Sequence, residues 1–350
     1  MGVFDKIFRK RGAEDPKTLK IKNINEPLQT QSDFGEKKVD SLAETLNKNG
    51  LNLIKLGRYN EAIQCCASAI EINPSYAEAW VNMGAAQGML GNHDEAIKFL
   101  NKALEIEPQY WEVWWNRGRE LYDLGRYEEA IASFKRVISI KPQFVGAFHS
   151  IGNALDELGH YENAISCYDE AIKIDPLFTA AINDKGLTLY KMGRYDEALQ
   201  LYEEAIRIDS NYVIAWINKG NALSEAKKYD QAIIAYDNAI EKNPKSDNAW
   251  VGKGYALNGQ GKYDEAINCF VKANEISPSY AAWINKGYSF SGLERFEEAI
   301  SCFDKAFETD PRYADALIAK GNILKKLHCD VEAEKAFAQA QGLHLRVLKY

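Results

Sequence analysis

Cysteine and histidine are the first residue types to consider, because both can ligate metals and both can act as catalytic groups. The chain has six cysteines and five histidines, but no Cys-x-x-Cys, His-Glu-x-x-His or Cys-x-x-Cys-His spacing joins them. Zinc, disulfide and haem sites therefore have no support in the sequence. A Gly-x-Ser-x-Gly nucleophile elbow and a phosphate-binding glycine loop are also absent. We predict a chain that is not an enzyme, with no catalytic residues, no metal ligands and no cofactor.

Glycine and alanine recur along the chain at a fixed period, and this period predicts the elements of the fold. A glycine recurs at every step of 34 residues except one step of 33: Gly50, Gly84, Gly118, Gly152, Gly186, Gly220, Gly254, Gly287 and Gly321. An alanine series that begins at Ala62 repeats the same single exception. The missing residue lies between Pro278 and Trp283, because tryptophan follows proline by six positions in other units and by five here. Nine units follow from this period.

Each unit is predicted to form two helices. In one unit these are Ala77 to Leu90 and His93 to Ile106, with Gly91 between them and Pro108 after the second. Glycine inside a helix costs roughly 0.5–1 kcal/mol relative to alanine. A recurring helical glycine therefore indicates a steric need, which is the close approach of two helices whose gaps are filled by larger residues.

The unit resembles the tetratricopeptide repeat (TPR), which carries Trp, Gly, Tyr, Ala, Tyr, Ala and Pro at these offsets. One unit shows the pattern in Trp216, Gly220, Tyr229, Ala232, Tyr236, Ala239 and Pro244. The resemblance covers residues 43–347 and implies an all-α, right-handed superhelical solenoid of nine repeats, which start near residues 43, 77, 111, 145, 179, 213, 247, 280 and 314. Three units depart from the pattern by carrying Lys227, Glu294 and His328 in place of the glycine between helices.

The resemblance also implies a concave groove that is lined by the first helix of each pair and binds peptides or proteins. Asparagine occupies many groove positions: Asn82, Asn116, Asn153, Asn218, Asn221 and Asn285. A row of amides can bond the backbone of an extended peptide without reading its side chains. In this the array resembles the TPR superhelix of O-GlcNAc transferase, without a catalytic domain. The alternative is that these amides bond only a neighbouring helix or water.

Aromatic residues are predicted on the same face. These are Trp115, Tyr122, Tyr190, Tyr255 and Tyr288. Exposed aromatic side chains act as anchors at binding surfaces, and Trp115 is the strongest candidate because Trp114 already occupies the core position. The alternative is that these rings only pack between adjacent first helices.

A basic residue stands directly before the recurring glycine in six units: Arg117, Lys185, Lys219, Lys253, Lys286 and Lys320. Either each side chain covers apolar surface and reaches water or an acidic neighbour, or the row favours an acidic partner. The net charge of −7 disfavours nucleic acid as that partner. The Lys/Arg clamp by which another TPR subfamily holds chaperone tails is absent, so binding of such tails is disfavoured.

The two ends of the chain lack the full repeat pattern. Residues 1–42 form a mostly polar leader that is predicted to be largely disordered, with a short amphipathic helix at 2–11 formed by Val3, Phe4, Ile7 and Phe8 beside basic residues. Residues 1–11 therefore have three interpretations, which are peripheral membrane contact, docking on a protein, and plain disorder. Residues 341–350 are apolar and form either a cap on the last repeat or a surface for self-association.

The composition, with 46% hydrophobic residues and no apolar stretch near the roughly 18 residues that span a bilayer, is typical of a folded cytoplasmic protein. We predict a non-catalytic scaffold or adaptor that binds a peptide or protein segment in its groove. The first alternative is a membrane-associated assembly factor that residues 1–11 hold at the inner membrane face. The second is a regulatory subunit of a separate enzyme.

Overall fold

The structure is a computed structural model that describes residues 33–347, with side chains from 41 to 343. Within this part of the chain, every regular element is a helix. The helices are α1 (Asp33–Lys55), α2 (Tyr59–Ile72), α3 (Ala77–Met89), α4 (His93–Ile106), α5 (Trp111–Asp123), α6 (Tyr127–Ile140), α7 (Val145–Glu157), α8 (Tyr161–Ile174), α9 (Thr179–Lys191), α10 (Tyr195–Ile208), α11 (Val213–Glu225), α12 (Tyr229–Lys242), α13 (Asp247–Gly259), α14 (Tyr263–Ile276), α15 (Tyr280–Gly292), α16 (Phe296–Thr309), α17 (Asp315–Lys326) and α18 (Asp330–Val347). The prediction of an all-α array of nine helix pairs is confirmed.

Both ends of the array differ in detail from the predicted boundaries. Helix α1 begins at Asp33, within the segment that the sequence assigns to the leader. Helix α18 continues to Val347, so residues 341–347, predicted as a cap or tail, prolong the last helix. The amphipathic helix predicted at 2–11 lies outside the described residues.

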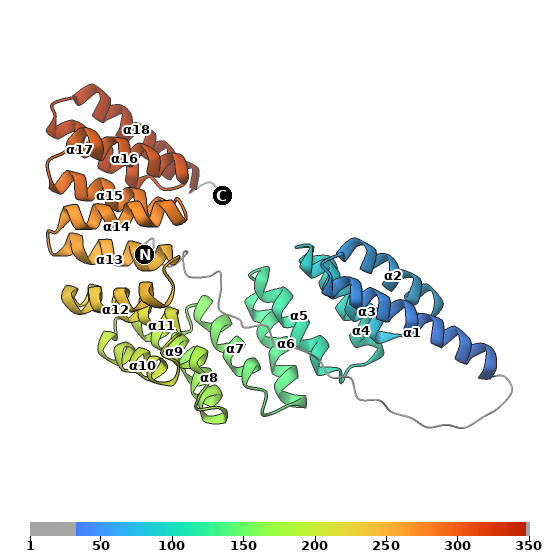
Figure 1. The fold of residues 1–350 in the computed structure, drawn as a ribbon. Coiled ribbons are helices and arrows are strands. Elements are labelled where there is room, and N and C mark those ends of the chain that lie inside the picture. Colours follow the sequence, from blue (N-terminus) through green and yellow to red (C-terminus); the bar gives the residue numbers. More distant parts are fainter. Residues whose placement is uncertain (1–32, 348–350) are drawn as a thin grey trace. The chain divides into compact units, whose positions relative to one another are not determined.

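The described residues form two compact units, one that ends at Asp184 and one that starts at Lys185, so the boundary falls within α9. In each unit a first helix packs on the second helix of its own repeat and on the next first helix. In the second unit, for example, α11 contacts α12 and α13, and α13 contacts α14 and α15. Figure 1 shows α13 to α18 as successive stacked pairs, coloured orange to red.

The recurring glycine of the first helix faces a large side chain from the middle of the second helix. A Cβ atom built on Gly254 would lie 2.6 Å from the ring of Phe270, and one on Gly220 would lie 2.6 Å from the ring of Tyr236. These rings are less than 2% exposed. The close approach that the helical glycines predicted is therefore confirmed, because only a residue without a Cβ leaves room for the ring.

The tryptophan early in the first helix ties that helix to the loop before it. Its indole N–H donates to the carbonyl oxygen six residues earlier, as in Trp80 to Pro74 (2.9 Å), Trp114 to Pro108 (2.9 Å) and Trp250 to Pro244 (3.1 Å). The spacing of six thus has a physical cause. Trp283, where the loop is one residue shorter, makes no such bond within the described residues. Its ring instead lies under Lys305, whose ammonium is 4.6 Å from the ring centroid.

The turn between the two helices of a repeat requires a positive φ angle. Six repeats use glycine, with φ from +73° to +81°. The three repeats that lack this glycine hold the same conformation with Lys227 (φ +58°), Glu294 (φ +60°) and His328 (φ +57°). Each turn closes with a backbone bond such as Lys228 N–H to the Leu223 carbonyl (2.8 Å), which is the pattern of a helix C-terminus capped by a left-handed residue.

The basic side chains that precede the recurring glycine form ion pairs with acidic residues of the array itself. Lys219 pairs with Glu203 (2.8 Å), Lys253 with Asp237 (2.7 Å) and Lys320 with Asp304 (2.6 Å), in each case an acid on the second helix of the preceding repeat. Lys219 and Lys253 also lie within 6.0 Å of the ring centroid of the tryptophan in their own repeat. The structure thus favours the first interpretation of this row, in which it needs no acidic ligand.

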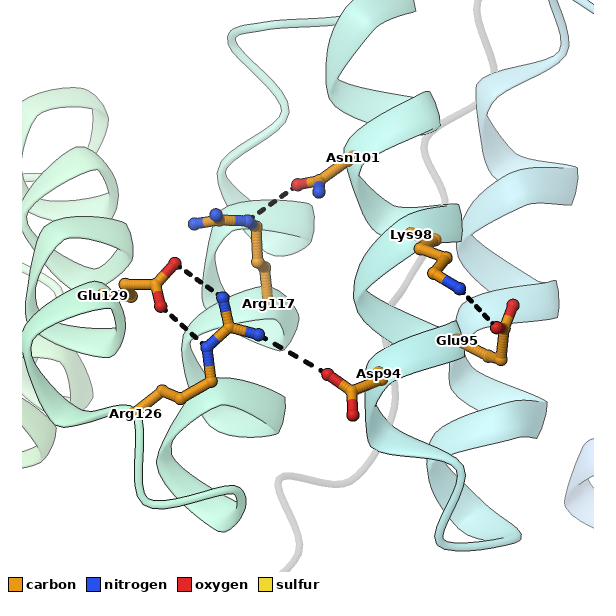
Figure 2. Close-up of polar contacts among 7 residues, drawn as sticks. All are labelled: Asp94, Glu95, Lys98, Asn101, Arg117, Arg126 and Glu129. Atoms are coloured by element: carbon orange, nitrogen blue, oxygen red, sulfur yellow. Dashed lines mark hydrogen bonds and ion pairs between the residues drawn. The ribbon is translucent and has the colours of Figure 1, made fainter.

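Arg117 shows the same behaviour with neutral partners. Its guanidinium donates to Asn101 of α4 (2.8 Å), as Figure 2 shows. It also donates to Ser133 of α6 (2.6 Å). Nearby, Arg126 donates to Glu129 of its own repeat (2.7 Å) and reaches Asp94 of the preceding one (3.5 Å). The contacts of Arg117 with Asn101 and of Arg126 with Asp94 join neighbouring repeats, and the exposed ion pair of Arg126 contributes little to stability.

Candidate functional site

A cavity of about 550 Å³ lies on the first helices of the last four repeats, entirely within the unit that starts at Lys185. Its walls include Glu225 of α11, Tyr255 of α13, Tyr280, Ile284, Asn285 and Tyr288 of α15, and Asp315, Ile318, Asn322 and Lys326 of α17. The size and the mixture of apolar, aromatic and polar walls are those of a ligand-binding cleft.

A smaller hollow of about 10 Å³ lies beside this cavity. It is lined by Tyr190, Asn221, Ser224, Glu225, Tyr236 and Tyr255. Glu225 and Tyr255 line both spaces. The two spaces together extend along the face of first helices from α9 to α17.

Two apolar side chains of the cavity are open to solvent. Tyr288 is 47% exposed and Ile318 is 36% exposed, although both carry large apolar groups. The edge of the Tyr288 ring rests on Phe303, with centroids 5.4 Å apart, so this ring is held in place from below. Exposed apolar groups on a supported surface are typical of contact points for a partner.

The phenols of the cavity are neutral at physiological pH. Burial raises the pKa of Tyr255, and the negative charge of Glu225 raises it further. Burial also raises the pKa of Tyr288, and Asp315 adds to this effect. These rings therefore offer an uncharged hydroxyl and an aromatic face beside two carboxylates.

Five of the predicted site residues belong to the unit that ends at Asp184: Asn82, Trp115, Asn116, Tyr122 and Asn153. The Asn82 amide donates to Asn47 of the preceding first helix (2.7 Å), and Asn47 in turn donates to Tyr76 (3.2 Å). Asn116 lies half-buried on α5. In this unit the interpretation that the asparagines bond a neighbouring helix therefore holds for Asn82.

The predicted aromatic anchors of that unit take part in packing. The Trp115 ring lies against Phe134 and Phe144, with centroids 5.2 Å and 5.0 Å away. The Tyr122 ring contacts Tyr127 at 5.3 Å. Both are partly buried against the same core cluster, which is the alternative that the sequence left open.

The remaining predicted residues lie in the unit that starts at Lys185, and most line the two spaces. Tyr190 and Asn221 line the hollow, Tyr255 lines both spaces, and Asn285 and Tyr288 line the cavity. Asn218 is 3% exposed and lines neither space. The structure thus brings Tyr190, Asn221 and Tyr255 together around the hollow, and it brings Tyr255, Asn285 and Tyr288 together around the cavity.

Two of the predicted asparagines bond a tyrosine of the second helix. The Tyr168 hydroxyl donates to Asn153 (2.8 Å), and the Tyr236 hydroxyl donates to Asn221 (2.7 Å). In three of the four repeats whose second helix carries phenylalanine at this position, another residue replaces the asparagine, as Tyr255 does in the repeat of Phe270. The last repeat keeps Asn322 together with Phe337. Asparagine at this position therefore has a structural cause wherever a buried hydroxyl needs an acceptor.

We expect the Asn221→Ala variant to lower the free energy of unfolding by about 1–3 kcal/mol, because the buried Tyr236 hydroxyl loses its acceptor. The double variant Asn221→Ala with Tyr236→Phe should recover most of this loss, since phenylalanine occupies the equivalent position at Phe270. Urea unfolding followed by circular dichroism measures both values. An Asn221→Ala variant as stable as the wild-type protein would show that this bond is not needed for the fold.

Sequence reasoning missed several residues of the cavity, namely Tyr280, Glu225, Asp315 and Lys326. The two carboxylates and the lysine stand in helix ends, where charged residues are common and draw no attention. Tyr280 had a signal in the sequence, because it follows Pro278 in the one loop that is shortened.

Other kinds of site were sought in the same residues. No group of three or more His, Cys, Asp or Glu side chains between residues 41 and 343 is arranged to hold a metal ion. No helix among those described is both long and apolar enough to cross a membrane. Residues 1–11, for which the sequence leaves membrane contact open, lie outside the described part of the chain.

Profiles of known families match most of the array. Those described as tetratricopeptide repeat match residues 41–109, 146–178, 167–200, 213–246, 235–268 and 280–313, and one described as TPR repeat matches 118–159 and 186–226. The chain belongs to the tetratricopeptide repeat family. This confirms the resemblance that the 34-residue period indicated. No curated protein matches the TPR chain in a sequence search.

Solved structures resemble this TPR protein in fold. A tetratricopeptide repeat protein from Parabacteroides merdae ATCC 43184 is 18% identical and superposes with a TM-score of 0.59 over 72% of this chain and 100% of its own. YrrB, described as a TPR protein with an unusual peptide-binding site, is 26% identical over 53% of this chain and 97% of its own, with a TM-score of 0.42. Yeast Tom70 is 15% identical over 87% of this chain and 92% of its own, with a TM-score of 0.45.

Proposed function

We propose that this TPR protein is a non-catalytic scaffold or adaptor that binds a protein or an extended peptide segment on the first-helix face of residues 185–347. The observation that carries the proposal is the cavity of about 550 Å³ between α13, α15 and α17, with Tyr288 and Ile318 open to solvent. Single exposed apolar side chains such as Ile234 are common on protein surfaces, but apolar groups gathered in a cavity with polar neighbours are typical of a binding site.

The polar groups of the cavity are suited to a peptide backbone. The Asn285 amide donates to the Ala281 carbonyl of its own helix (2.8 Å), and its oxygen has no partner among the described residues. Asn322 lies exposed on α17, in a repeat whose second helix carries Phe337 and therefore has no hydroxyl at this position. The two amides differ in this respect from Asn153 and Asn221, which bond tyrosines. Amides with open positions can bond the N–H and C=O groups of an extended segment.

The pocket variant Tyr288→Ala with Ile318→Ala tests this proposal. We expect it to lose a partner that the wild-type protein retains in affinity capture from the source cell with cross-linking, because it removes the two exposed apolar contacts of the cavity. Both side chains are more than one third exposed, so the fold should be retained, as circular dichroism would show.

The matched control is Ile234→Ala with Val331→Ala. These residues are 61% and 62% exposed and lie on the second helices α12 and α18, outside the cavity. A partner that the control retains and the pocket variant loses supports the proposed site. A partner bound equally by all three proteins overturns it and directs attention to other surfaces of the chain.

A further inference from the structure

The loop of Pro278 has one residue fewer than the other repeats, and this changes where the next helix starts. In most repeats the aromatic residue two places after proline stands just before the first helix, as Tyr110 does before α5 and Phe144 before α7. In the short loop, Ser279 takes the capping position, and its hydroxyl accepts from the Ala282 backbone N–H (3.2 Å). Tyr280 therefore becomes the first residue of α15 and forms part of the cavity wall.

Tyr280 brings an aromatic ring into this wall. The residue is 6% exposed, and its hydroxyl oxygen, which lies near the backbone of Ala316, is sealed from solvent. Its ring is held by Tyr313, with centroids 4.7 Å apart. The Tyr280 ring is therefore a fixed part of the cavity wall beside Asp315.

The charge beside this hydroxyl is negative. Asp315 opens α17 as an exposed residue, and it has no ion-pair partner among the described residues. Burial raises the pKa of Tyr280, and the charge of Asp315 adds to the effect. The same two causes act on Tyr288. Both phenols are therefore neutral beside a carboxylate that lacks a cation.

The basic residue of the cavity wall stands at the other end of the same helix. Lys326 lies eleven residues after Asp315, which is about 16 Å along an α-helix. Its ammonium lies 5.8 Å from the centroid of the Phe296 ring. Lys326 thus does not neutralise Asp315, and Glu225, the other carboxylate of the wall, also has no ion-pair partner in the described residues.

We propose that the end of the cavity formed by Tyr280, Tyr288 and Asp315 binds the guanidinium group of an arginine in the partner segment. This inference rests on the proposed function and specifies its partner. The Asp315 carboxylate supplies the opposite charge and accepts from the guanidinium, the exposed Tyr288 ring supplies a face for stacking, and the Tyr280 ring closes the wall beside them. Arginine fits better than lysine, because a planar guanidinium stacks on a ring and donates in several directions at once. Ile284 and Ile318 cover its aliphatic stem.

Panning of a displayed library of random short peptides on the wild-type protein tests the inference. We expect enrichment of arginine-containing peptides. A peptide selected in this way is then synthesised with arginine and with citrulline, which has the same shape but no charge. Fluorescence polarisation should show roughly tenfold or greater weakening by citrulline on the wild-type protein, because a charge-assisted contact is lost.

The Asp315→Asn variant, measured with both peptides, completes a double-mutant cycle between the protein and the peptide. It should bind the arginine peptide roughly tenfold more weakly than the wild-type protein and should distinguish little between arginine and citrulline, since the partner charge is gone. Glu308→Gln, at an exposed position of α16 outside the cavity wall, removes the same charge and should leave the preference for arginine intact.

Other outcomes contradict the inference without touching the proposed function. Selected peptides that lack arginine, or an arginine preference that survives Asp315→Asn, would overturn the assignment of the guanidinium site. Failure to enrich any peptide would overturn it too. The proposed function is decided separately by the capture experiment with the Tyr288→Ala and Ile318→Ala variant, which does not depend on arginine.

Discussion

Replacement of Phe270 by alanine is expected to lower the free energy of unfolding of the unit that starts at Lys185 by about 3–5 kcal/mol. The Phe270 ring is fully buried and fills the space opposite Gly254. Its neighbours on α14 are small, with Ala266 and Ala273 in the same cluster, so they cannot close the space that the ring leaves. Urea unfolding followed by circular dichroism at 222 nm measures the loss, with the slope checked because repeat arrays do not always unfold in two states.

Two controls separate this effect from a general sensitivity of the helices. Ile234→Ala truncates a side chain that is 61% exposed and should change stability by less than about 0.5 kcal/mol. Gly342→Ala adds a methyl group that would meet nothing within 4 Å, so it should be neutral or slightly stabilising. If Phe270→Ala costs no more than these controls, the ring opposite glycine is not what holds the repeats together.

This contact explains why so much of the fold follows from the sequence. Glycine inside a predicted helix is unfavourable, so its recurrence predicted a close approach of two helices, and the structure places the rings of Tyr236 and Phe270 at that position. Helix ends were predicted from glycine and proline, and the predicted helix His93 to Ile106 has the same bounds in the structure. Local rules and the repeat period agree in each unit, which makes such an array readable from its sequence.

The candidate site follows from the sequence less completely, because a face can be predicted while the partner of each side chain on it cannot. Asn221 and Asn285 both lie on first helices, yet one accepts from the Tyr236 hydroxyl and the other donates to its own helix. The contact of Asn221 with Tyr236 is indicated in the sequence by two positions of the repeat, the residue after the recurring glycine and the residue in the middle of the second helix. Asparagine after the recurring glycine goes with tyrosine in the second helix in two repeats, as in Asn153 with Tyr168. The signal is incomplete, because the repeat of Tyr202 has Leu187 at this position and the repeat of Phe337 has Asn322.

The prediction of Trp115 as an anchor shows a second limit. Its position after Trp114 indicated a residue in excess of the core, but the ring rests between Phe134 and Phe144. Phe144 comes from the loop before the next helix, so the contact joins two repeats. Contacts of this kind depend on how far one repeat is displaced from the next, and a single unit of sequence does not contain that displacement.

Tyr280 shows how a small irregularity in the sequence leads to the cavity, and it gives the second large expected effect. Insertion of one alanine between Tyr280 and Ala281 restores the 34-residue step. We expect the helix to start later, as in the repeats of Tyr110 and Tyr212, and the Tyr280 ring to leave the cavity wall beside Asp315. The affinity for an arginine peptide selected on the wild-type protein should then fall tenfold or more in fluorescence polarisation, because two of the three groups that hold the guanidinium no longer act together.

The insertion should leave the array folded, since seven of the eight glycine-to-glycine steps in the chain are unaffected and the eighth becomes like its neighbours. Helical content by circular dichroism checks this. The same insertion after Gln143, in the loop before α7 of the other unit, should leave peptide binding unchanged. If the variant with the restored step binds the peptide as tightly as the wild-type protein, the short loop is a neutral deletion. If binding falls while folding is kept, the loss of one residue is what distinguishes this repeat as a binding site from the repeats around it.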